Sequence, residues 1–177
     1  MLVPPAVAAA QDDAAWEDAV LTAAQYVLDQ EQAWFRTLNP GQIVVDVNSG
    51  FGYEIEGGPI HTATRSAAAR LASSIGARPG RLSDVMECPG RAPTVEEYAG
   101  GYWGCRLVGN TEVVIQVDDP VAVEDGLSVW IGLWDQVRDP EGRPRNVAVA
   151  GREVLLSRGD DGRWAVTGWG LHTAGHY

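Results

Sequence analysis

The stretch EVLLSRGDDGRWAV, residues 153–166, decides the fold, because it contains two strand patterns on either side of a turn. The turn is Gly159-Asp160-Asp161-Gly162, and glycine and aspartate are the residues that hairpin turns favour. We therefore expect residues 147–158 and 163–173 to pair as an antiparallel hairpin. Just upstream, residues 127–134 alternate between aliphatic and other side chains, which predicts a further strand.

Two helices are expected before these strands. Residues 12–38 repeat apolar side chains at helical spacing, and Asn39-Pro40-Gly41 ends the pattern. A second apolar stripe predicts a helix over residues 62–77, with His61 on the surface or as a cap before it. Shorter strands are expected over residues 42–47, 81–88, 103–108 and 112–117, and the last two are expected to pair across Gly109-Asn110.

This order of elements predicts the fold class. Helices that come first and a run of strands that comes last are typical of α+β proteins. We expect a long N-terminal helix and a second helix packed on a curved, mainly antiparallel sheet. A length of 177 residues suits one domain, so residues 12–177 are expected to form it, after a signal-peptide remnant or disordered tail over 1–11.

The charge balance excludes several classes of partner and chemistry. The chain has 13 basic residues, all Arg, against 24 acidic ones, and its formal net charge is −11. Such an acidic chain is a poor ligand for a phosphate backbone, so no nucleic acid is expected to bind. Without any Lys, Schiff-base chemistry and a phosphate-loop lysine are excluded. No apolar run approaches the ~20 residues of a membrane span, and no spacing of His, Cys or acidic residues predicts a metal or cofactor site.

Two features point to an oxidising compartment. The N-terminus ends a short apolar stretch on Ala8-Ala9-Ala10, as a secretory cleavage site would, although it lacks a basic start. Cys88 and Cys105 flank a Gly/Pro-rich loop and are expected to form one structural disulfide; two buried free thiols are the alternative. We expect a secreted or periplasmic protein of a bacterium, because Arg without Lys and abundant Ala and Gly reflect GC-rich codons.

The long first helix over residues 12–38 and the closing hairpin, with its return Gly162-Arg163-Trp164-Ala165-Val166, resemble the nuclear-transport-factor-two-like (cystatin-like) superfamily. The resemblance implies a cone, in which a strongly curved sheet wraps a helix and leaves a pocket. Some members are enzymes that move a proton or add water, and many are binding or assembly modules. No catalytic residue of the superfamily maps onto a matching motif of this chain, so none is carried over.

The candidates for catalysis are few, because no nucleophile elbow, phosphate loop or metalloprotease motif occurs. If the last strand continues without interruption, the even-numbered residues 164–172 share one face. His172 would then stand at the mouth of a cone and act as a general base, with Asp46 or Asp135 as the second proton carrier. The alternative is that His172 is an exposed residue at a fraying terminus.

Tryptophans offer a second kind of site. Trp130 and Trp134 share one face of the predicted strand, and Trp103 is expected on a neighbouring strand. Stacked indoles bind sugars or other flat apolar ligands, whereas the alternative is ordinary core packing in a chain with only two Phe.

These observations favour a binding or assembly module without catalysis, which acts on a protein partner or on further copies of itself. The alternative is a small-molecule enzyme for proton transfer, hydration or hydrolysis, with its site in the cone of the sheet.

Overall fold

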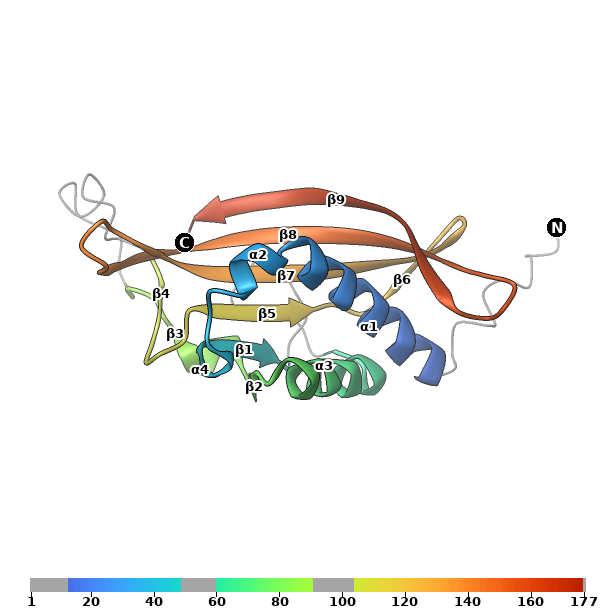
Figure 1. Cartoon of the computed structure of the whole chain (residues 1–177), viewed down its shortest axis with the longest axis horizontal. Helices are drawn as coiled ribbons and strands as arrows, with labels where there is room; N and C mark the ends of the chain where they lie inside the picture. Colours follow the sequence, from blue (N-terminus) through green and yellow to red (C-terminus); the bar gives the residue numbers. More distant parts are fainter. Residues whose placement is uncertain (1–12, 49–59, 91–103, 177) are drawn as a thin grey trace.

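The computed structural model describes residues 13–48, 60–90 and 104–176, and for residues 32, 34 and 171–176 it describes the backbone alone. Trp103 and the predicted tail over residues 1–11 lie outside the described residues. Figure 1 shows helices packed against one side of a curved, unclosed sheet, which confirms the predicted α+β class. None of the helices in the described ranges is long and apolar enough to cross a membrane.

The main sheet has seven strands and is mostly antiparallel. Its strands run in the order β2-β1-β5-β7-β8-β9, and β6 pairs with β7 beside β5. These strands are β1 (Ile43–Asp46), β2 (Arg78–Gly80), β5 (Val113–Val117), β6 (Val121–Val123), β7 (Gly126–Arg138), β8 (Pro144–Arg158) and β9 (Trp164–His176).

The three longest strands form the predicted antiparallel meander. β7 pairs with β8 from Leu127↔Leu156 to Arg138↔Pro144, and β8 pairs with β9 across the predicted turn. The prediction that the even-numbered residues 164–172 share one face is wrong, because two bulges interrupt β9. Leu155 pairs with Gly168 and Leu156 with Val166, so Thr167 is an extra residue, and His172 is extra in the same way. Each extra residue shifts the alternation by one position.

The predicted pairing of residues 103–108 with 112–117 is also wrong. β5 lies in the centre of the main sheet, parallel to β1 and antiparallel to β7. All five of its residues are buried, as is typical of a central strand that is covered on both faces. β4 (Arg106–Leu107) pairs instead with β3 (Met86–Glu87) in a separate small sheet.

The helices pack on one face of the main sheet. α1 (Asp13–Gln30) ends earlier than the predicted residue 38, and α2 (Gln32–Phe35) follows after Glu31. This bend lets Phe35 and Leu38 pack against the same core as α1. α3 (Thr62–Ile75) agrees with the prediction: His61 caps it by accepting a hydrogen bond from the Ala63 N–H, and Gly76 ends it at φ 68°.

The sheet separates two apolar cores. We call the side under α1 and α3 the helix face; Ile115, Ile131 and Val154 point to it. The opposite side, the far face, carries Val114 and Trp134. The smaller core on the far face is completed by residues 82, 85, 86, 105 and 107 from the chain around β3 and β4.

Residues 81–88 form a short helix as well as the predicted strand. α4 (Leu82–Val85) precedes β3, and the Leu82 N–H donates to a buried carboxylate oxygen of Asp46 at 2.9 Å. The β3–β4 register pairs Glu87 with Arg106, so the next residues along, Cys88 and Cys105, face each other. They form the predicted disulfide, with an S–S distance of 2.07 Å.

Candidate functional site

A hollow of about 290 Å³ opens on the helix face where β7 and β8 run side by side. It exists because β8 places two small side chains, Ala148 and Ala150, opposite Asp135 and Leu133 of β7. Alanines fill little of the space above a sheet, so a trough remains between their larger neighbours. We call this the β7–β8 hollow; its lining residues are Glu31, Leu133, Asp135, Ala148, Ala150 and Arg152.

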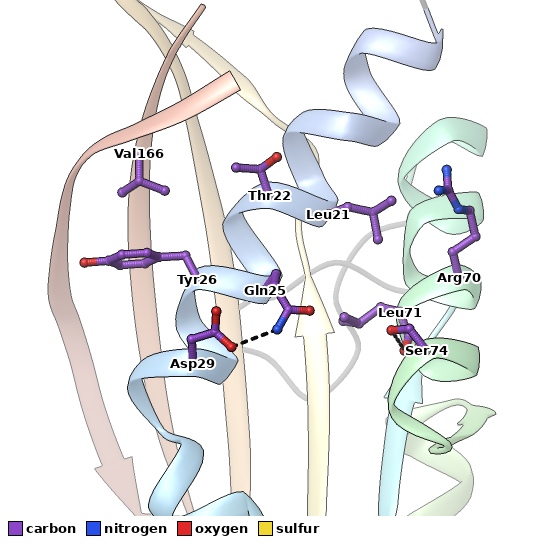
Figure 2. Close-up of a pocket in the computed structure, with 9 residues that line it drawn as sticks. All are labelled: Leu21, Thr22, Gln25, Tyr26, Asp29, Arg70, Leu71, Ser74 and Val166. Carbon is purple, nitrogen blue, oxygen red and sulfur yellow. Dashed lines mark hydrogen bonds between the residues drawn. The ribbon is translucent and has the colours of Figure 1, made fainter. Parts of the chain in front are cut away.

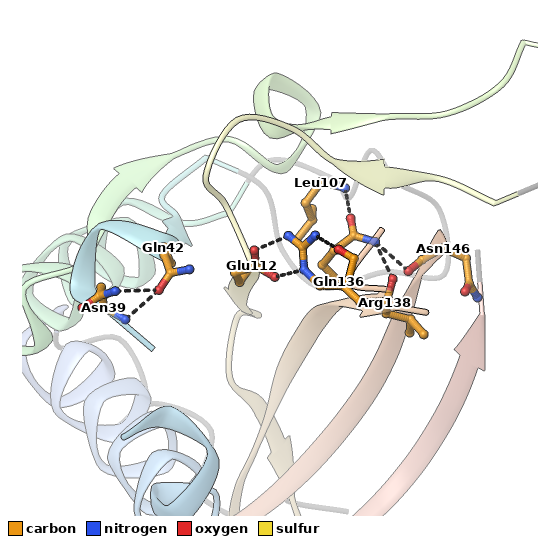
Figure 3. Close-up of polar contacts among 9 residues, drawn as sticks. Asn39, Gln42, Leu107, Glu112, Gln136, Arg138 and Asn146 are labelled. Carbon is orange, nitrogen blue, oxygen red and sulfur yellow. Dashed lines mark hydrogen bonds and ion pairs between the residues drawn. The ribbon is translucent and has the colours of Figure 1, made fainter. Parts of the chain in front are cut away.

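Asp135 stands at one end of the hollow. Burial raises the pKa of its carboxyl group, and the negative charge of Glu112 raises it further. Glu112 itself is paired with Arg138, whose Nε donates to Glu112 Oε2 at 3.1 Å (Figure 3). Arg138 is thus paired with Glu112. Because the pKa of Asp135 is raised, a bound proton or a nearby cation would stabilise its carboxyl group.

Arg152 stands at the other end. Its Nη2 donates to Glu31 Oε1 at 2.7 Å, which ties β8 to the junction between α1 and α2. Its side chain is only 15% exposed. The second guanidinium nitrogen, Nη1, is buried and has no hydrogen-bond partner in the described part of the chain. A buried N–H without an acceptor is unfavourable, and among the described side chains none supplies that acceptor.

A broader groove of about 580 Å³ crosses the outer side of α1 (Figure 2). Thr22, Gln25 and Asp29 stand along the helix, with Leu71 and Ser74 of α3 on one side and Val166 of β9 on the other. Arg70, at its edge, pairs with Glu17 and so holds α3 against α1. Beside this groove the exposed Trp169 of β9, 49% accessible, packs edge-on against Tyr26.

Of the tryptophans predicted to bind a ligand, Trp134 is not available on an open surface. Trp130 and Trp134 do lie on the same face of β7, the far face. Trp134, however, is completely buried, and its indole N–H donates to Gln116 Oε1 at 2.6 Å. It is therefore part of the core, as the alternative interpretation expected. Trp103 lies outside the described residues, so its position adds nothing.

Asp46 is also committed to the core. It is 0% exposed, and its carboxylate accepts hydrogen bonds from the backbone N–H groups of Asn48 and Leu82 and from the side chain of Gln116. Since Asp46 lies beside Gln116 on the far face, the sheet separates it from Asp135. The two carboxylates proposed as alternative proton carriers therefore belong to different sides of the molecule.

His172 can be placed only by its backbone. It is the extra residue of the second β9 bulge, between Leu171, which pairs with Arg152, and Thr173, which pairs with Gly151. Its side chain lies outside the described part of the structure, so no proton relay to Asp135 can be traced.

β9 forms one border of the main sheet. It is 13 residues long and pairs with β8 alone among the described residues. In Figure 1 it runs along the outer margin of the sheet, beyond β8. None of its 13 residues is Asp, Glu, Lys, Arg or Pro, whereas β8 carries Arg145, Arg152, Glu153 and Arg158.

Sequence reasoning selected Asp135 but missed Glu31 and Arg152. The sequence did contain a signal for Arg152. In a strand, residues two positions apart share a face, so Arg152 is a charged residue on the same face as the buried Val154. Glu31 carried no signal, since its role depends on where the bend after α1 meets β8. Compared with known protein families, with curated proteins and with solved structures, the chain matches none.

Proposed function

We propose that the protein is a secreted or periplasmic binding module that acts through protein–protein contacts, by adding a partner's strand to β9. The observation that carries this proposal is the composition of β9. Edge strands are normally protected from pairing by charged residues, especially Lys, or by Pro, and β9 has neither. No described strand pairs with the outer backbone groups of β9, which therefore form a template for another strand.

The side chains around this edge fit the same role. Ala165 and Thr167 are small and exposed, so a partner strand can approach the backbone closely. Trp169 adds an exposed aromatic surface beside Tyr26, and Trp residues are enriched where proteins bind each other. The two bulges bend β9 and are themselves a device that limits indiscriminate pairing at a sheet edge, so a partner strand has to follow this bend.

The compartment is supported by the disulfide. A bonded Cys88–Cys105 pair is compatible with an oxidising space outside the cytoplasm, where such bonds persist. Intact mass of the natively produced protein, after thiol alkylation without reductant, tests this directly. We expect loss of the first ten residues and no alkyl group; a full-length chain with two alkyl groups would refute export and disulfide together.

The partner site is tested by charging the edge. Ala165→Lys and Thr167→Lys, made together, place two ammonium groups on exposed β9 positions, and Ala69→Lys on the exposed side of α3 is the matched control. By light scattering, we expect the natural chain to form a species larger than 19.0 kDa or to retain a co-purified partner. The double variant should lose this association and the control should keep it. A monomer without a partner at all concentrations would overturn the proposal.

The enzymatic alternative retains one supporting feature. Asp135, with its raised pKa, lines a hollow on the helix face, as a proton carrier in a cone would. Asp46 does not share this hollow. We therefore keep a small-molecule activity as the second candidate, with Asp135 as its proton carrier, and Asp135→Asn should abolish any such turnover while the protein stays folded.

A further inference from the structure

The β7–β8 hollow has two polar ends and an apolar middle. Asp135 pairs with Ala148 across β7 and β8, and Arg152 lies four residues further along β8 on the same face. At about 3.3 Å per residue, the backbone positions of the two ends are roughly 13 Å apart. Between them the lining is Ala148, Ala150 and Leu133.

The charges at the two ends differ. At one end, Arg152 is neutralised by Glu31 but has a second, buried N–H without an acceptor in the described part of the chain. At the other end, the negative charge of Glu112, which is paired with Arg138, acts on Asp135. Counting only the side chains that the structure describes, the first end therefore has an N–H without an acceptor, and the second has a carboxyl group without a cationic partner.

We propose that the β7–β8 hollow binds a small aliphatic molecule with an ammonium group at one end and a carbonyl or carboxylate at the other. The ammonium group pairs with Asp135, and the oxygen accepts from Arg152 once that side chain turns its buried Nη1 toward the hollow. The methylene groups between them lie on the alanines. This binding does not depend on strand addition at β9, so either proposal can fail alone.

The direct test uses 6-aminohexanoate as the probe, with hexanoate and hexylamine as controls that each keep one polar end. Amide NMR shifts report the location and titration reports the affinity. We expect shifts at residues 133–135 and 148–152, and affinity at least about tenfold higher than for either control, because each end adds a charge-assisted bond. If hexylamine bound as tightly as 6-aminohexanoate, Arg152 would have no role in binding. If no amide signal shifted at any concentration of 6-aminohexanoate, the proposal would be overturned.

Variants separate a binding site from a packing defect. Ala150→Val fills the hollow with a β-branched residue that suits a strand, and Ala122→Val on the exposed β6 is the matched control. We expect Ala150→Val and Asp135→Asn each to lower the affinity for 6-aminohexanoate at least about tenfold, while Ala122→Val leaves this affinity unchanged. Retained cooperative unfolding of each variant shows that it still folds. Unchanged affinity in both hollow variants would refute the site.

Discussion

Trp134 belongs to a buried chain of polar groups on the far face. Its indole N–H donates to Gln116, and Gln116 donates in turn to Asp46 at 3.2 Å. All three side chains are essentially inaccessible. Buried polar groups stabilise a fold only when they are satisfied, so each member depends on its neighbours.

Trp134→Phe is therefore expected to destabilise the protein. The change keeps most of the aromatic volume but removes the donor to Gln116 Oε1, which should lower the free energy of unfolding by about 1–3 kcal/mol. Chemical denaturation measures this difference. Trp169→Phe, at a half-exposed position, should change it by no more than about 0.5 kcal/mol. Equal effects of the two changes would contradict the role given to this hydrogen bond.

Asp118 gives a pH-dependent prediction. Burial raises the pKa of its carboxyl group, and the neighbouring charge of Asp119 raises it too. The folded state therefore holds this proton more tightly than the unfolded state, so the stabilisation is complete below about pH 3.9 and is lost as the pH rises through the folded pKa. Asp118→Asn keeps an oxygen for the Asp119 N–H and removes the charge.

We expect the melting temperature of Asp118→Asn to exceed that of the natural chain at pH 7, and the difference to vanish near pH 3. The melting temperatures at both pH values test this sign. Asp160→Asn, on the exposed hairpin turn, is the control. If Asp118→Asn were less stable than the natural chain at pH 7, burial of the charged Asp118 carboxylate would not be destabilising the folded state.

At the scale of elements, local patterns and long-range partners differ in how well the sequence predicts them. The closing hairpin, the helix over 62–75 and the cysteine pair depend on short signals: a turn, a capped apolar stripe and a spacing. The partners of β5 are instead set by long-range packing, because all five of its residues are buried and the strand shows no alternation. No periodicity distinguishes a central strand's partners, so the pairing with β1 and β7 could not be read from the chain.

The small β3–β4 sheet is expected to depend on its disulfide. Two residue pairs alone form a weak ladder, and the bond closes a segment with a sequence separation of 17. Loss of the bond in Cys88→Ser/Cys105→Ser should cost about 3 kcal/mol of unfolding free energy. Denaturation with and without reductant measures it, and the double variant should no longer respond to reductant. If reduction leaves the natural chain unchanged, the pair contributes nothing to its stability.

At the scale of the whole molecule, the sheet separates a helix face, with its hollow and groove, from a far face that the second core covers in part. The sequence placed Asp135 and Asp46 together as candidates, because alternation alone does not say which face a strand turns to its helices. The bulges of β9 were equally hidden, since one extra residue leaves the composition of a strand unchanged.

The border strand is the feature of the whole molecule on which the proposed function depends. An edge with neither charged residues nor proline is unusual in a chain whose residues are 21% charged. Its pairing state can be measured without any mutation, because amides that point away from β8 exchange with solvent rapidly unless another strand covers them.

Residue-resolved hydrogen exchange of β9, in the protein as purified natively, is therefore the most direct test. We expect both alternating sets of β9 amides to be protected in the associated species, and the set that points away from β8 to lose its protection in the Ala165→Lys/Thr167→Lys variant. Rapid exchange of that outward set in the largest native species would show that nothing pairs with β9 and would contradict the proposed function.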